Sequence, residues 1–98
     1  MYSLRPGESV AMEGTCLYDA QVQCRIRIVR SPVRYGSADY EDPEDIASDL
    51  TQETFYIQYG STTEFNHFNA GGGGYPTLGE AMAAARSAPG IGPTVQWK

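Results

Sequence analysis

The chain contains little of the chemistry on which small metal-binding or disulfide-linked domains depend. Its 98 residues include two cysteines and one histidine. Two cysteines are too few for a disulfide framework and too few for a closed zinc site. No apolar run approaches the roughly 18 residues that a membrane-spanning helix needs. The sequence therefore predicts no cofactor, no metal site and no membrane span.

A secretory signal is also not expected. Residues 1–10 include charged side chains and a proline, and they contain no apolar h-region. We therefore expect one cytoplasmic domain over residues 1–98, acting inside a host cell. In that reducing compartment Cys16 and Cys24 would be free thiols.

Residues 21–30 carry the strongest structural signal, because polar and apolar side chains alternate from Gln21 to Ile28. This is the period of a β-strand with one buried face and one solvent face. Residues 10–18 contain apolar residues in the same phase, and a turn at 19–21 would join the two segments as an antiparallel hairpin. The predicted register pairs Tyr18 with Val22, Cys16 with Cys24, Glu13 with Arg27 and Met12 with Ile28.

Shorter segments predict the rest of the sheet. Residues 54–59 alternate and form a third strand, and a short turn leads to a fourth strand at 63–68. The glycine-rich residues 69–76 are predicted to be a flexible surface connection. Residues 94–97 alternate again and are interpreted as a closing strand.

Two helical segments complete the predicted architecture. Thr77 and Glu80 form a capping box ahead of an alanine-rich run, which predicts a helix over 77–88. A proline followed by acidic residues predicts a short acidic helical segment within 42–50. The expected class is α+β: an antiparallel sheet of four or five strands with the Ala-rich helix packed on one face. The opposite face of the sheet is expected to be open to solvent.

No motif in the chain specifies a reaction. A Cys24–His67 couple is the least favoured hypothesis, because a thiol in the middle of an apolar strand is usually an inert small hydrophobe. The four glycines at Gly71–Gly74 lack the lysine and the strand-to-helix context of a phosphate-binding loop. We therefore predict no catalytic residues and a protein that is not an enzyme.

Charge is the most informative feature of the composition. The net charge is −5, yet seven of the 12 acidic residues lie within 39–53, and four of the seven basic residues lie within 25–34. An acidic segment on a rigid scaffold can meet the basic surface of a partner protein, accelerating association and adding specificity. Alternatively, these acidic residues have no binding role and only form the solvent-exposed start of a helix. The candidate partner-binding residues are Asp39, Tyr40, Glu41, Asp42, Glu44, Asp45, Asp49, Arg25, Arg27 and Tyr35.

A single-stranded nucleic-acid-binding module is the alternative function. Arg25, Arg27 and Arg30 would form a basic strand face, and Tyr35 could stack on a base. The acidic net charge disfavours this reading, because phosphates would be repelled at long range. No direct contact with nucleic acid is therefore expected.

The stretch from Tyr75 to Ala85 carries a resemblance to a known class of proteins. A capped, alanine-rich helix after a glycine-rich loop, on a small acidic antiparallel sheet, resembles small phage and mobile-element proteins, including anti-CRISPR inhibitors. The resemblance implies a non-enzymatic inhibitor that docks on a CRISPR ribonucleoprotein and blocks nucleic-acid binding. It assigns no role to a particular residue, and a homodimer is compatible with it.

Overall fold

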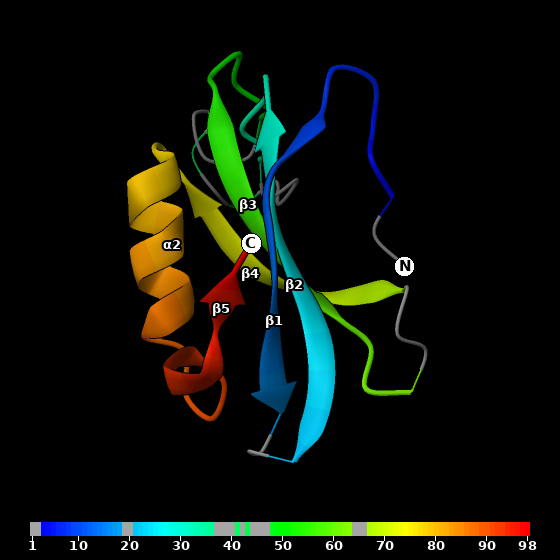
Figure 1. The fold of residues 1–98 in the computed structure, drawn as a ribbon. Helices are drawn as coiled ribbons and strands as arrows, with labels where there is room; N and C mark the ends of the chain where they lie inside the picture. Colours follow the sequence, from blue (N-terminus) through cyan, green and yellow to red (C-terminus); the bar gives the residue numbers. More distant parts are fainter. Residues whose placement is uncertain (1–2, 19–20, 37–40, 42, 44–47, 64–66) are drawn as a thin grey trace.

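The computed structural model describes residues 3–18, 21–36, 41, 43, 48–63 and 67–98. These form a five-stranded antiparallel sheet of order β4-β3-β2-β1-β5 with one α-helix on one face (Figure 1). This arrangement confirms the α+β class. The strands are β1 (Ser9–Tyr18), β2 (Val22–Ser31), β3 (Thr54–Gly60), β4 (Phe68–Tyr75) and β5 (Gln96–Trp97); α2 spans Leu78–Arg86 and the 3₁₀-helix η1 spans Gly92–Thr94. The acidic helical segment predicted within 42–50 falls largely outside the described residues.

The central hairpin has the predicted register. Cys16 lies opposite Cys24 and Glu13 lies opposite Arg27. The register shifts once, between Val10 and Met12. A slip by one residue would place the apolar residues of both strands on the wrong face, so the burial pattern itself fixes the pairing.

The main core lies between α2 and the sheet. The two isoleucines Ile26 and Ile28 are at most 1% exposed, and each contributes roughly 1.5–3 kcal/mol through burial. The small side chains of Ala81 and Ala85 face this layer and are fully buried, which lets the helix approach the strands closely. The buried members of this core are Cys16, Cys24, Ile26, Ile28, Phe55, Ile57, Ala81 and Ala85.

Helix α2 begins at its capping residue. The Thr77 hydroxyl accepts a hydrogen bond of 3.1 Å from the backbone N–H of Glu80, and an acidic residue in the first turn also suits the positive end of the helix dipole. The helix ends at Arg86, and Gly90 beyond it takes a positive φ of 76°. The helix is thus shorter than the predicted range 77–88.

The predicted connection at 69–76 is wrong, and the predicted fourth strand at 63–68 overlaps β4 only at Phe68, with residues 64–66 outside the described residues. The glycine run is itself strand β4, which pairs with β3 so that Tyr56 lies opposite Gly74. A Cβ atom on Gly74 would lie 2.7 Å from the Tyr56 ring, and one on Gly72 would lie 2.9 Å from the Tyr59 ring. The glycines are therefore accommodated in the sheet because neighbouring tyrosine rings occupy the space of the missing side chains.

The sheet face opposite α2 is predicted to be open to solvent, but the structure shows that it is partly covered. Val29 is completely buried and Phe68 is 4% exposed. The N-terminal segment 3–8 lies on the side of the sheet away from α2 (Figure 1). We call this face the second sheet face; it carries Arg25, Arg27, Val29, Ser31, Thr54, Tyr56 and Gln58.

Candidate functional site

A cavity of about 650 Å³ lies between the N-terminal segment 3–8 and the second sheet face. Its floor includes Val29 and Tyr56, and Gly71 and Gly73 of β4 line one wall. This volume is within the range of sites that hold a small ligand or a partner's side chain. We call this recess the N-terminal cavity.

Four side chains hold the rim of the N-terminal cavity in place. The Tyr35 hydroxyl donates a hydrogen bond of 2.7 Å to Glu8, and the Tyr35 backbone N–H donates one of 2.8 Å to the Tyr56 hydroxyl. The rings of Tyr35 and Tyr56 are 5.5 Å apart, and the Arg5 guanidinium lies 4.5 Å from the centre of the Tyr35 ring. These contacts tie segment 3–8 to β3 through Tyr35.

The Glu8 carboxylate interacts with several polar and charged groups at this rim. Burial by itself would raise the pKa of Glu8, but hydrogen bonds from the Arg5 backbone, the Tyr35 hydroxyl and Ser31, with the charge of Arg5, lower that pKa below its ordinary value of 4.5. Glu8 is therefore ionised at neutral pH. A lowered pKa stabilises the folded state above the ordinary value, and this contribution is lost as pH falls through the folded-state pKa.

Arg25 and Arg27 lie beyond the cavity on the same sheet face and bracket Phe68. Their guanidinium carbons are 5.3 and 4.0 Å from the centre of the Phe68 ring. Arg27 also donates a hydrogen bond of 2.7 Å to the buried Gln58, and Arg25 forms a 3.4 Å ion pair with Glu13. Burial and the neighbouring Arg25 lower the pKa of Arg27. Both arginines therefore have structural contacts within the protein.

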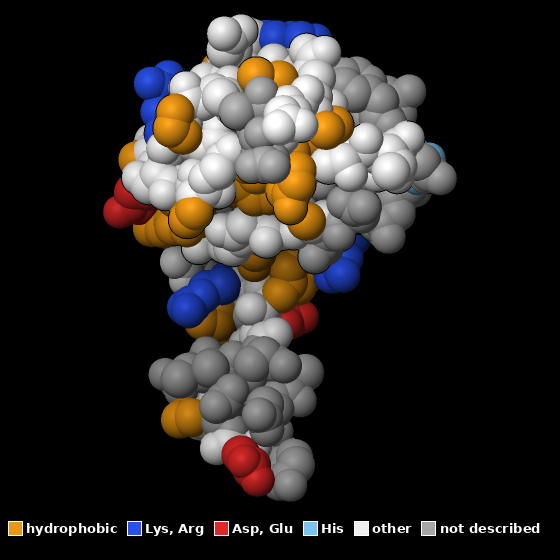
Figure 2. Space-filling model, turned by 90° about the horizontal axis from the view of Figure 1, so that it is seen from below, with side chains coloured by type: hydrophobic (Ala, Val, Ile, Leu, Met, Phe, Trp, Pro, Cys, Tyr) orange, Lys and Arg blue, Asp and Glu red, His pale blue; other side chains and the backbone are white. Residues whose placement is uncertain are grey.

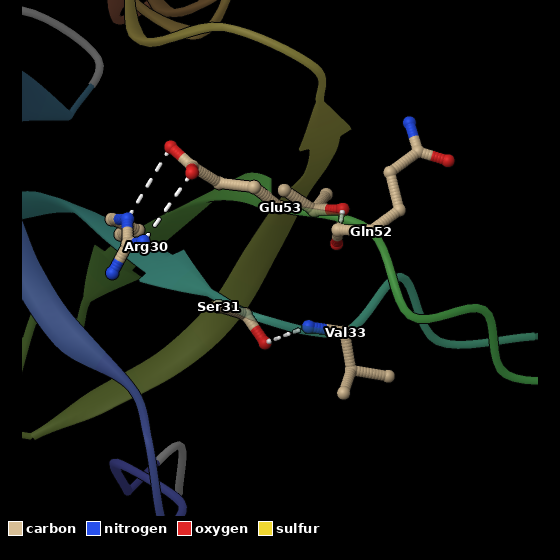
Figure 3. A network of polar contacts seen from close by, with 6 residues as sticks. Arg30, Ser31, Val33, Gln52 and Glu53 are labelled. Carbon is tan, nitrogen blue, oxygen red and sulfur yellow. Dashed lines mark hydrogen bonds and ion pairs between the residues drawn. The ribbon is translucent and has the colours of Figure 1, made fainter.

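Further contacts join the end of β2 to the residues just before β3. Arg30 forms a 3.3 Å ion pair with Glu53 (Figure 3), and Arg34 bridges to Leu50 through the backbone. The Ser31 hydroxyl, also in Figure 3, accepts a hydrogen bond of 3.2 Å from the Val33 backbone N–H. These contacts fix both ends of the connection between β2 and β3.

Two of the predicted acidic residues lie in the described part of the chain. Glu41 and Asp49 are both exposed, and the Asp49 carboxylate accepts a hydrogen bond of 2.8 Å from the Gly36 backbone N–H. Gly36 follows Tyr35, so Asp49 lies close to the rim of the N-terminal cavity. The remaining predicted residues of this segment lie outside the described residues: Asp39, Tyr40, Asp42, Glu44 and Asp45.

The structure also places the residues of the enzymatic alternative. Cys24 is 3% exposed, and burial raises the pKa of its thiol, so the thiol is protonated at neutral pH. His67 is exposed just before β4. Among the described residues, no group of three His, Cys, Asp or Glu side chains is placed to hold a metal ion. No described helix has the length and apolar character needed to cross a membrane.

Sequence reasoning missed the N-terminal cavity and its neighbour Phe68. One signal was present: Val29 follows Ile28 and breaks the alternation of β2 with an apolar residue on the supposedly wet face. A buried residue there requires a cover on the second sheet face. Nothing in residues 3–8 identifies them as that cover, because Arg5 and Glu8 make their contacts with Tyr35, which is distant in sequence.

Comparisons with known proteins add no assignment. Models of protein families, curated protein sequences and solved structures were compared with this chain, and none of them matches it. The function must therefore be inferred from the chemistry and geometry of the second sheet face.

Proposed function

We propose that this protein is a small non-enzymatic binding domain that docks on a partner protein through its second sheet face. The N-terminal cavity is the observation that carries the proposal. Its floor is apolar at Val29, and Leu4 at its rim leaves 44% of its surface exposed. An apolar recess with a polar rim is suited to receive an anchoring side chain of a partner.

The charges around the cavity favour a partner of mixed character. Arg5 lies at the rim, whereas Asp49 and Glu41 are exposed in the segment that leaves beside Tyr35. The acidic segment would attract a basic surface and speed the encounter, and the apolar recess would hold the complex once formed. We infer a contact with an apolar centre, the N-terminal cavity, and an acidic margin, by which we mean the acidic residues of segment 39–53.

The partner class follows from the resemblance to small phage and mobile-element proteins. We infer that the partner is a nucleic-acid-handling protein complex with a basic channel, such as a CRISPR ribonucleoprotein, and that docking blocks its access to nucleic acid. The acidic segment supports this inference, because it carries the charge that such a channel attracts. We propose in addition that the protein acts in the cytoplasm of a host cell.

Single-stranded nucleic-acid binding by the Arg face is less well supported. Arg25 and Arg27 are engaged by Glu13, Gln58 and Phe68, so a nucleic acid would have to compete with contacts inside the protein. Salt-sensitive binding of a labelled oligonucleotide by the pure protein, lost on removal of these arginine charges, would favour that alternative over protein docking.

The acidic margin can be tested by removing its charges. A partner is first isolated from the source cell on the immobilised full chain, and its association kinetics are then measured at several salt concentrations. The variant combining Asp42→Asn, Glu44→Gln, Asp45→Asn and Asp49→Asn is expected to associate on the order of tenfold more slowly at low salt, with a flatter salt dependence.

A control variant removes two acids elsewhere in the chain. Asp19→Asn with Glu64→Gln changes two carboxylates outside the segment and is expected to leave the association rate near that of the wild type. If the segment variant retains the wild-type association rate and salt slope, the acidic margin has no part in binding. If only a second copy of the chain is captured, the proposal of an inhibitor is wrong.

A further inference from the structure

The two cysteines of the chain lie directly opposite one another in the central hairpin. Cys16 in β1 is the register partner of Cys24 in β2, and both thiols are free. They are 2% and 3% exposed. Opposed residues of an antiparallel pair have Cα atoms about 4.5 or 5.5 Å apart, and disulfides span Cα separations of roughly 4.4–6.8 Å. The backbone therefore already has the spacing of a disulfide.

The same two thiols line a second cavity. This cavity has a volume of about 310 Å³ and is also lined by Tyr18, Tyr59 and Ile91. It lies toward the turn of the β1–β2 hairpin, the end of the molecule viewed from below in Figure 2, where hydrophobic side chains reach the surface. Tyr18 at this end is 53% exposed. A small neutral reagent therefore has a recess that both cysteines line.

We propose that Cys16 and Cys24 form a thiol–disulfide pair that closes across the hairpin by exchange with a low-molecular-weight disulfide. This inference concerns the helix-covered side of the sheet and is independent of the proposed docking on the second sheet face. It assigns a chemical role to two buried groups that the docking surface does not use.

The exchange proceeds in two steps. The Cys24 thiol first loses its proton. Its thiolate then attacks one sulfur of the small disulfide, breaks the S–S bond, forms a mixed disulfide and releases one small thiolate, which takes up the proton. Cys16 then loses its proton and attacks the Cys24 sulfur, releasing the second small thiol. In total, two protein thiols are oxidised to one disulfide, and the small disulfide is reduced to two thiols.

The order of the two cysteines follows from their surroundings. Burial, with the neighbouring Cys24, raises the pKa of Cys16 to about 11. Burial also raises the pKa of Cys24, but a backbone hydrogen bond from Tyr18 opposes that shift. Cys24 is therefore assigned as the attacking thiol and Cys16 as the resolving thiol.

The test uses the folded full chain and 2-hydroxyethyl disulfide, which is small and uncharged. After incubation, remaining thiols are alkylated and the intact mass is measured. We expect the wild type to lose both alkylatable thiols without retaining any reagent. Cys16→Ser is expected to accumulate one reagent adduct on Cys24, because the resolving thiol is missing. Cys24→Ser is expected to react more slowly than Cys16→Ser.

Three results would overturn the proposal. The wild type could retain two reagent adducts, it could form disulfides between chains, or it could keep both thiols under conditions that oxidise the same protein in denaturant. The wild-type measurement decides the question even where a variant fails to fold. Circular dichroism of each protein before incubation identifies such a variant.

Discussion

Replacing Phe68 with alanine is expected to lower the free energy of unfolding by about 3–5 kcal/mol. Phe68 is 4% exposed, and the Arg27 guanidinium carbon lies 4.0 Å from the centre of its ring. The substitution removes the buried ring and the cation–π contacts with both arginines of the second sheet face. Denaturant-induced unfolding followed by circular dichroism measures this change.

Phe68→Leu is the matched control. Leucine keeps much of the buried apolar volume but offers no aromatic face, so we expect a loss of less than about 2 kcal/mol. If Phe68→Ala lies within the uncertainty of the wild type, then the second sheet face is not a packed layer. An equal loss in both variants would show that the cation–π contacts, and not the packed volume, are responsible.

Replacing Gly14 with alanine is expected to detach β5 from the sheet edge and to cost about 1–3 kcal/mol of stability. A Cβ atom on Gly14 would overlap the Gln96 carbonyl and lie 3.1 Å from the Trp97 Cα. Strand β5 pairs with β1 at Gly14 and Thr15, so the substituted residue is one of the two register partners of this strand. Hydrogen exchange of the Lys98 amide, which donates a bond of 2.9 Å to Glu13, reports the detachment.

Gly79→Ala is the control for this glycine series. A Cβ atom there meets no atom within 4 Å, and alanine is favoured over glycine in a helix by about 1 kcal/mol. We therefore expect Gly79→Ala to be neutral or stabilising. Equal destabilisation by the two substitutions would contradict the assignment of Gly14 as a close backbone contact.

The central hairpin could be predicted from the sequence because the residues that determine it are close together along the chain. The alternation of residues 21–30 fixes the buried face, and the opposed Glu13 and Arg27 are compatible with only one register. The start of α2 could be predicted for the same reason, since Thr77 and Glu80 are three residues apart. In both cases the residues that decide the structure are near one another along the chain.

Strand β4 and the N-terminal cavity could not be predicted because they depend on contacts between residues that are far apart along the chain. A glycine run favours a flexible loop unless something fills the space beside it, and here Tyr56 and Tyr59 of another strand do so. Similarly, contacts such as the hydrogen bond from the Tyr35 hydroxyl to Glu8 hold segment 3–8 on the sheet, and these two residues are 27 positions apart. Among the candidate site residues, Tyr35 lies at the rim of the N-terminal cavity, but its contacts within the protein could not be predicted from the sequence.

Leu4→Glu and Val22→Glu form the pair of variants that tests partner docking on the second sheet face most directly. The two side chains have similar exposures, 44% and 39%, but Leu4 lies at the N-terminal cavity and Val22 lies at the opposite hairpin end. Both variants should fold as the wild type does, because both side chains are already at the surface.

Equilibrium affinity for the captured partner is the measurement. We predict that Leu4→Glu weakens binding by at least about tenfold, or about 1.4 kcal/mol, because a carboxylate at the cavity rim must be desolvated on docking. Val22→Glu is predicted to bind with wild-type affinity. Unchanged binding by Leu4→Glu, or a loss confined to Val22→Glu, would contradict docking through the second sheet face.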